Sequence, residues 1–79
     1  MITQEAILQF LEDDLGIDTA DIETETLLFS TGIVDSFALV TLMLFLETEG
    51  RFKINPADVN LDNFDSIARV LAYVERAAA

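Results

Sequence analysis

The chain has no cysteine and no histidine, and it contains only four Lys and Arg residues among 79. Without cysteine, neither a disulfide nor a thiolate metal site can stabilise the fold. Without histidine, the chain lacks the commonest general base and the commonest metal ligand. These absences argue against most hydrolytic and group-transfer enzymes. A chain this short buries only about 60% of its unfolded surface, so its stability must come from the 52% of residues that are hydrophobic.

Positive charge is scarce and unevenly placed. The net charge is −11; residues 1–50 contain eleven Asp and Glu but no Lys or Arg, whereas residues 51–79 contain four of each sign. Such a surface repels nucleic acid and anionic membranes. We therefore expect protein partners with basic patches, attracted by the electrostatic field. Charge of this size also serves simply to keep a small apolar protein in solution.

Long hydrophobic runs are absent as well. The longest apolar segment covers residues 37–46, which is too short for a bilayer span of about 20 residues. Residues 1–5 lack the cationic stretch of a signal peptide. The sequence thus predicts a cytoplasmic protein without a membrane span. We expect one domain over residues 1–79, and a monomer.

Hydrophobic periodicity predicts an all-α fold, beginning with a helix over residues 4–15. Thr3 is expected to cap the start of this helix, and Gly16 to end it. Its core face is predicted to carry Ile7, Leu8, Leu11 and Leu15, with Phe10 beside them.

Three further helices are expected in the second half of the chain. The longest should run from residue 35 or 36 to about 48, with Gly50 as its terminator. A single helical turn is expected over residues 61–64, and a last helix from residues 65–66 to about 75. This last helix is predicted to bury Ile67, Val70, Leu71 and Val74.

Residues 16–34 show no sustained helical or strand period. A stretch of this length without regular structure is uncommon in a compact domain and tends to be functional. Its apolar residues are expected to fold back over the core. The predicted fold is therefore a small up-down four-helix bundle with a short third helix and a long loop between helices one and two.

One segment combines a glycine, a helix start and an apolar helix. It reads Gly32-Ile33-Val34-Asp35-Ser36-Phe37 and continues into the apolar residues 38–46. Asp35 is predicted to be the N-cap, which leaves the Ser36 hydroxyl outward at the loop–helix junction. The N-terminus of a helix favours an anion such as a phosphodiester. No histidine, and no lysine before residue 53, is present to activate this serine, so another enzyme must modify it.

This arrangement resembles the prosthetic-group attachment site of acyl and peptidyl carrier proteins of the stand-alone type, and the resemblance extends over nearly the whole chain. It implies that Ser36 carries 4′-phosphopantetheine, which a phosphopantetheinyl transferase adds from coenzyme A with magnesium. It also implies a carrier, not an enzyme, that moves an acyl or aminoacyl thioester between loading and transferring enzymes. The alternative is a non-covalent helical interaction module without a prosthetic group, in which Ser36 only caps a helix.

Two other segments imitate functional motifs. Asp65-Ser66 also opens a predicted helix, but no glycine or long loop precedes it, so we assign Ser66 a capping role. The stretch Asp58 to Asp62 resembles the first half of a calcium-binding EF-hand loop. The sixth and twelfth positions of such a loop require glycine and glutamate, whereas here they are Asn63 and Arg69. No metal site is predicted.

The helix after Ser36 departs from the pattern of many fatty-acid carriers, because its first ten positions carry no charge. A helical projection places four residues on the core side, namely Leu39, Leu42, Met43 and Leu46. Phe37, Val40 and Leu44 point the opposite way and are predicted to bind partner enzymes, although burial under the long loop is an alternative. This departure favours an acyl, aminoacyl or D-alanyl carrier of a specialised pathway, whose cargo the sequence does not identify.

Overall fold

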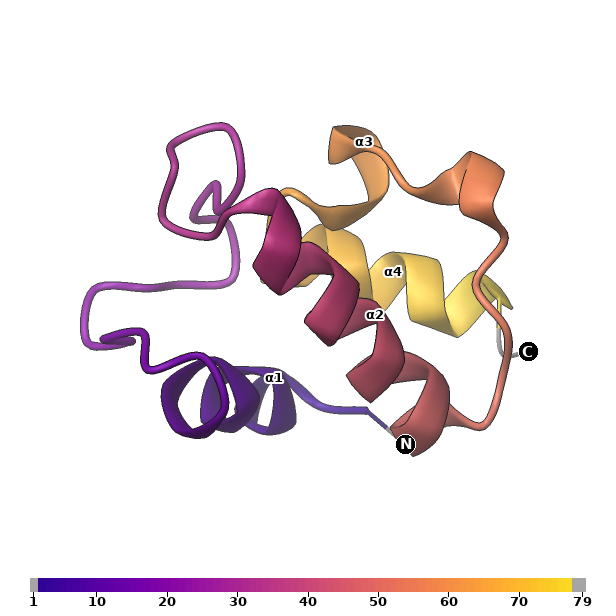
Figure 1. The fold of residues 1–79 in the computed structure, drawn as a ribbon, viewed down its shortest axis with the longest axis horizontal. Coiled ribbons are helices and arrows are strands. Elements are labelled where there is room, and N and C mark those ends of the chain that lie inside the picture. Colours follow the sequence, from indigo (N-terminus) through magenta and orange to yellow (C-terminus); the bar gives the residue numbers. More distant parts are fainter. Residues whose placement is uncertain (1, 78–79) are drawn as a thin grey trace.

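The computed structural model describes residues 2–77, and residues 1, 78 and 79 lie outside this description. The helices are α1 (Gln4–Asp13), α2 (Ser36–Gly50), α3 (Leu61–Phe64) and α4 (Ile67–Ala77), with one 3₁₀ turn, η1 (Pro56–Asp58), between α2 and α3. Within residues 2–77 there is no strand. The predicted all-α fold, with its short third helix and its long loop between α1 and α2, is confirmed (Figure 1).

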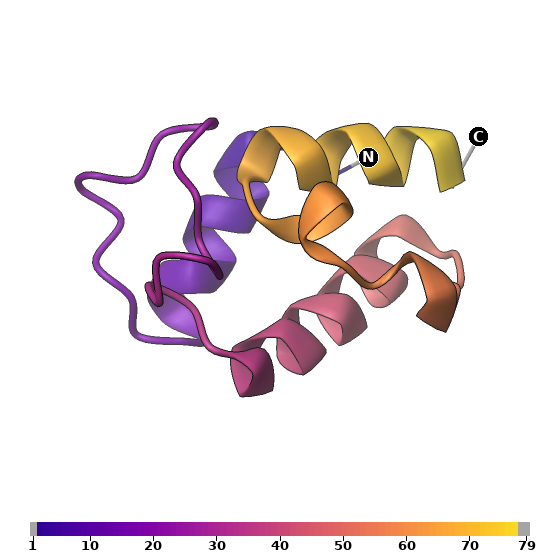
Figure 2. The same cartoon turned by 90° about the horizontal axis from the view of Figure 1, so that it is seen from above.

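The helices enclose a single apolar core. In Figure 1, α2 crosses in front of α4 and α3 lies above both, and Figure 2 shows α2 and α4 in separate layers. Both views show the segment between α1 and α2 extending from one side of the molecule. The core takes side chains from all four helices and from this long loop: Ile7, Phe10, Leu11, Ile22, Leu28, Val34, Leu42, Leu46, Phe64, Ile67, Val70, Tyr73 and Val74, together with Ile2 and Ile54. No helix in the described part of the chain is long and apolar enough to cross a membrane.

Helix α1 begins where the sequence predicted and ends two residues earlier. The Thr3 side chain accepts a hydrogen bond from the Ala6 N–H at 3.1 Å, which confirms Thr3 as the cap. The helix ends at Asp13 instead of residue 15, and Gly16 follows in a left-handed conformation at φ 66°. Of the predicted core face, Ile7 and Leu11 are buried, whereas Leu8 and Leu15 are half-buried; Phe10 is buried with them.

The predicted terminator of α2 was wrong. Gly50 is the last residue of the helix, and the left-handed residue that ends it is Arg51, at φ 55°. A Cβ at Gly50 would lie 2.7 Å from two carbon atoms of the Phe52 ring. The glycine at position 50 therefore allows the Phe52 ring to approach the helix, and its conformational freedom is not what stops α2.

The long loop covers the core only in part. Ile22 and Leu28 are buried as expected, but Leu27 is exposed. A backbone hydrogen bond of 2.9 Å from the Ala68 N–H to the Thr24 carbonyl also ties the loop to α4.

Helix α4 begins at Ile67, not at residues 65–66, and it continues to Ala77. The Ser66 hydroxyl accepts a hydrogen bond from the Arg69 N–H at 3.2 Å, in agreement with its predicted capping role. Asp65 differs from the prediction, because it is buried and accepts hydrogen bonds from the long loop. The core side of α4 also includes Tyr73, which the periodicity did not single out.

Candidate functional site

Asp35 sets the start of α2. Its backbone is extended, and its carboxylate accepts a hydrogen bond from the Ala38 N–H at 2.8 Å, as predicted for an N-cap. Ser36 is consequently the first residue of the helix. The first N–H groups of a helix have no carbonyl partner within it, and they carry the positive end of the helix dipole. The serine thus lies at a position where an added negative charge is favoured.

The backbone that leads into Ser36 makes a left-handed turn at Gly32. This glycine has φ 81°, and its N–H donates to the Phe29 carbonyl at 3.1 Å. A Cβ at this position would meet nothing within 4 Å, so the backbone conformation, and not lack of space, requires glycine. Ser36 itself is exposed to solvent. The turn thus leads into the start of α2, where the Ser36 hydroxyl is accessible.

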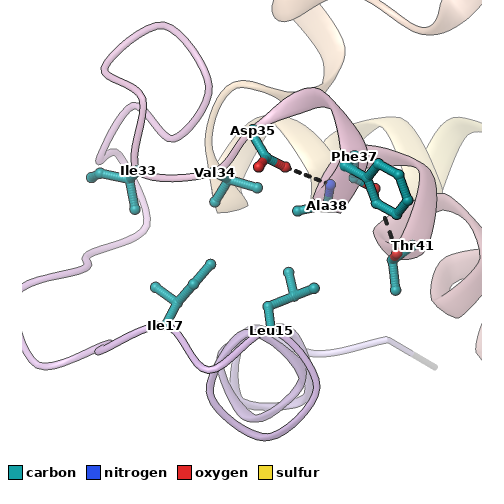
Figure 3. A pocket seen from close by; sticks show the side chains of 8 residues that line it. All are labelled: Leu15, Ile17, Ile33, Val34, Asp35, Phe37, Ala38 and Thr41. Atoms are coloured by element: carbon teal, nitrogen blue, oxygen red, sulfur yellow. Dashed lines mark hydrogen bonds between the residues drawn. The ribbon is translucent and has the colours of Figure 1, made fainter.

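Two hollows lie on either side of the serine motif. The first, of about 350 Å³, separates the segment after α1 from the beginning of α2 (Figure 3). Leu15 and Ile17 point across it toward Val34 and Ala38. Its lining residues are Leu15, Ile17, Ile33, Val34, Asp35, Phe37, Ala38 and Thr41.

The second hollow, of about 390 Å³, lies toward α3 and includes Ser36 in its lining. The other lining residues are Phe29, Gly32, Val34, Asp35, Leu39, Val59, Asn60, Leu61 and Phe64. A group attached at this serine would therefore have a mostly apolar surface beside it.

The outer side of α2 is apolar and exposed. Phe37, Val40 and Leu44 have 83%, 56% and 60% of their surface exposed. On the opposite side, Leu42 and Leu46 are buried. The exposed outer side and the buried Leu42 and Leu46 agree with the predicted projection, whereas Leu39 and Met43 are only half-buried. The alternative prediction, that the outer residues are buried under the long loop, was wrong. That these three side chains bind a partner stays a prediction.

The second Asp-Ser pair presents no accessible hydroxyl. Ser66 is only 2% exposed, and its oxygen is engaged by the Arg69 N–H. The structure therefore separates the two serines, since Ser36 is accessible to a modifying enzyme and Ser66 is not.

Sequence reasoning missed Asp65 as a structural partner of the serine loop. Its carboxylate is 3% exposed, and it accepts hydrogen bonds from the Phe29 N–H at 2.7 Å, the Ser30 N–H at 3.0 Å and the Ser30 hydroxyl at 2.7 Å. Burial raises the pKa of the Asp65 carboxyl, but the hydrogen bonds from Ser30, Phe29 and Leu28 outweigh this effect and hold it below its usual value. Its neighbours include the polar residues Asn63 and Ser66, so no sequence signal marked Asp65 as buried or indicated partners 35 residues away.

The segment that imitates a calcium loop uses its oxygen atoms for hydrogen bonds. Asp58 accepts from the Tyr73 hydroxyl at 3.0 Å through its carboxylate and from the Asn63 amide at 2.8 Å through its carbonyl. The Leu61 carbonyl accepts from the Arg69 guanidinium at 3.1 Å. These contacts connect η1 and α3 to each other and to α4.

Comparisons with known proteins agree on one family. Residues 5–74 match the family described as "Phosphopantetheine attachment site". Three curated relatives, each named D-alanyl carrier protein, come from Lactobacillus acidophilus (29% identical), Leuconostoc citreum (28%) and Leuconostoc mesenteroides (31%). Each alignment spans 75 residues and covers 95% of this chain and 94% or 95% of the relative.

A solved structure shares the fold over most of the chain. It is described as "Crystal structure of FAD-dependent dehydrogenase", with a TM-score of 0.76 and 26% sequence identity. The match covers 86% of this chain and 97% of that chain, so the matched chain is close to this one in length.

Proposed function

Because the chain belongs to the phosphopantetheine attachment-site family, we propose that Ser36 is the residue that bears its 4′-phosphopantetheine arm. The protein is a carrier and not an enzyme, and it shuttles acyl or aminoacyl groups between biosynthetic enzymes. Family membership also decides against a non-covalent interaction module. The observation that carries the assignment to Ser36 is its exposure at the capped start of α2, in contrast to the buried Ser66.

The residues around Ser36 fit a phosphodiester. Its negative charge would face the N-terminal N–H groups of α2, where the helix dipole favours an anion. The Asp35 carboxylate is held by the Ala38 N–H, so it fixes the helix start. When bound, the arm supplies a terminal thiol that holds the cargo as a thioester. The chain itself positions the hydroxyl and presents the surface on which enzymes dock.

Enzymes that load the arm and accept its cargo are the partners of a carrier domain. Among them we propose a phosphopantetheinyl transferase that uses coenzyme A and magnesium. We also propose that partners dock on Phe37, Val40 and Leu44, because these exposed apolar side chains follow the serine along α2. A monomeric state and a cytoplasmic location stay predictions.

D-alanine is the cargo we propose first. The three curated relatives are named D-alanyl carrier proteins and align over nearly their whole length. A D-alanine-activating ligase should therefore load the holo protein with D-alanine in the presence of ATP. Intact mass measured after incubation with D-alanine, and separately with a fatty acid and its ligase, distinguishes the two cargo classes. Loading with the fatty acid alone would contradict the D-alanyl assignment.

A second candidate follows from the similarity to the chain in the structure described as an FAD-dependent dehydrogenase. Under this proposal, the carrier presents an acyl or aminoacyl thioester to a flavin enzyme that oxidises it. Incubation of the loaded protein with such an enzyme should then lower the cargo mass by two hydrogens and reduce the flavin. A cargo that stays unchanged while a matched carrier is oxidised would exclude this role.

The attachment site is tested by intact mass after incubation with coenzyme A, magnesium and a broad-specificity transferase. The wild-type protein and Ser66→Ala should each gain one phosphopantetheine, whereas Ser36→Ala should gain none. Circular dichroism of both variants verifies that the helices are retained. Modification of Ser36→Ala would show that the arm is attached elsewhere.

A further inference from the structure

A buried carboxylate joins two parts of the chain that are far apart in sequence. Asp65 lies between α3 and α4, and its two carboxylate oxygens accept hydrogen bonds from the Phe29 and Ser30 N–H groups and from the Ser30 hydroxyl, at 2.7 to 3.0 Å. Its backbone carbonyl accepts a fourth hydrogen bond, from the Leu28 N–H at 2.7 Å. We call this set of four hydrogen bonds the Asp65 clasp.

The clasp continues to the start of α2. The Leu28 carbonyl accepts a hydrogen bond from the Val34 N–H at 2.9 Å, and both side chains are almost completely buried. Val34 immediately precedes Asp35, the residue that caps α2 at Ser36. Asp65 is therefore connected to the helix start through two successive hydrogen-bonded steps. The hydrogen bond between Leu28 and Val34 closes the loop that includes Gly32, and the Asp65 clasp attaches this loop to the rest of the bundle.

The clasp depends on an ionised carboxylate. Three of its four donors bind the carboxylate, and they are neutral N–H and O–H groups. An ionised carboxylate is an acceptor at both oxygens. The lowered pKa of Asp65 agrees with an ionised group that is held by donors. An asparagine has nearly the same shape and its oxygen can keep the two N–H donors, but the amide group would donate to the Ser30 hydroxyl, and all of these bonds lose the charge of the carboxylate. Such a substitution weakens the clasp without opening a cavity.

We propose that Asp65 is a positioning residue for the loading of Ser36. It holds the Leu28–Val34 loop so that the start of α2 has the conformation that the modifying enzyme binds. This inference rests on the proposed attachment at Ser36. If the clasp is broken, only a fraction of the molecules has the competent loop, and the apparent affinity for the transferase falls by that fraction. Once bound, the serine is in the same place as in the wild type, so the chemical step is preserved.

The test compares loading kinetics of three variants with those of the wild type. Asp65→Asn should raise the KM of the transferase for the carrier about tenfold, the loss expected when a charged acceptor of several hydrogen bonds is replaced by a neutral one. Its kcat should stay within about twofold of the wild-type value. Ser30→Ala removes only the hydroxyl donor, and Ser30 is exposed, so it should raise KM by roughly threefold.

Ser66→Ala is the matched control. Ser66 is the neighbour of Asp65 and is as deeply buried. The substitution also removes a hydrogen bond, but the partner in that bond is Arg69 in α4 and not the loop. It should lower the melting temperature while leaving KM unchanged. Amide hydrogen exchange provides a second measurement: Asp65→Asn should accelerate exchange at Phe29, Ser30 and Val34 more than in the α4 core.

The outcomes separate this inference from the proposed function. If Ser36→Ala is still loaded, the assignment of the attachment site to Ser36 is wrong, whatever the Asp65 variants show. If Ser36→Ala is not loaded but a folded Asp65→Asn keeps the wild-type KM, the positioning role is wrong. An equal KM increase in Ser66→Ala would also overturn it, because general destabilisation would then account for the effect. If Asp65→Asn does not fold, Ser30→Ala decides: a raised KM supports the role, and an unchanged KM overturns it.

Discussion

At the scale of single residues, the dipeptide Asp-Ser occurs twice in this chain, in two different environments. Asp35-Ser36 is exposed, and its aspartate caps the helix from outside through the Ala38 N–H. In Asp65-Ser66 both residues are buried, the serine caps α4 and the aspartate turns away to bind the long loop. Both pairs satisfy the rules of helix capping. Their difference comes from the loop that packs against the second pair, so it arises from tertiary structure.

Tyr73 offers a pH-dependent prediction. Burial raises the pKa of its hydroxyl, and the hydrogen bond to the Asp58 carboxylate raises it further above its ordinary value of 10.0. A group whose pKa is raised on folding stabilises the protein below its unfolded pKa, and this contribution is lost as the pH rises through the folded pKa. We therefore expect the free energy of unfolding to fall above about pH 10.

The measurement is direct because the chain contains a single tyrosine and no tryptophan. The ultraviolet absorbance of the phenolate reports the titration of Tyr73 alone, beside circular dichroism of the same samples. Asp58→Asn should shift the midpoint toward pH 10, since it removes the negative partner and leaves the burial. A wild-type midpoint at or below 10 would contradict the expected shift.

Arg51 offers a stability prediction. It is an exposed residue that ends α2 in the left-handed conformation, at φ 55°. That conformation is unfavourable by roughly 1–2 kcal/mol for a residue with a Cβ, and glycine adopts it without this strain. Part of the gain is lost to the greater freedom of glycine in the unfolded chain. Arg51→Gly should therefore raise the free energy of unfolding by about 1 kcal/mol in a urea titration.

The matched control is Gly50→Ala, one residue earlier. Its Cβ would collide with the Phe52 ring at 2.7 Å, so it should destabilise the protein, by about 1–3 kcal/mol. A destabilised Arg51→Gly would show that Arg51 does not end α2 in the left-handed conformation, and a stabilised Gly50→Ala would show that the Phe52 ring does not pack against Gly50.

At the scale of elements, α2 carries the next prediction. Its outer side exposes Val40 and Leu44, whereas its inner side buries Leu42. Val40→Asp combined with Leu44→Arg should leave the helical circular dichroism and the melting temperature nearly unchanged, because both side chains already face solvent. The same double variant should impair transfer of cargo to partner enzymes, since charged side chains on α2 would have to lose water to pack against an apolar surface of the partner.

Leu42→Ala is the comparison for this surface. Truncation of a buried leucine destabilises a protein by about 2–5 kcal/mol, so thermal melts separate the two variants clearly. Normal transfer by the Val40/Leu44 double variant would show that partners bind on another side of the carrier.

The elements also show what the sequence alone was able to predict. Helices α1 and α4 were recognisable because their apolar residues recur at helical spacing. Helix α2 was recognisable because a long uncharged run follows the capping residue Asp35 and ends near Gly50. The end of α2 was misplaced because the role of Gly50 depends on Phe52, which packs back against it. The path of the loop and its attachment to Asp65 were not predictable, because irregular backbone has no period and its partners lie 35 residues away.

At the scale of the whole molecule, the charge predicts a response to salt. The net charge is −11, and the radius of gyration is 11.3 Å. The screening length is about 30 Å at 0.01 M ionic strength and about 8 Å at 0.15 M. At low salt the acids therefore repel one another across the entire molecule, whereas at moderate salt only neighbours interact. The melting temperature should rise between these two conditions, and magnesium should have the same effect.

A variant with fewer acids is the control for this effect. Asp21→Asn with Glu25→Gln removes two exposed charges from the long loop, and its melting temperature should depend less on salt than that of the wild type. A wild-type melting temperature that is flat or falls with salt would show that repulsion between carboxylates does not limit stability.

The Asp65 clasp can form only after α3 has been synthesised. The ribosome makes Ser36 before Asp65, and a domain generally folds as a unit. A chain that has not yet reached α3 therefore presents the serine without the partner that holds its loop, and the transferase meets a poor substrate. Completion of the C-terminal helices converts that chain into a good one. Under the proposed roles of Ser36 and Asp65, addition of the arm therefore favours carriers that are already finished, and a truncated or misfolded chain is loaded less efficiently.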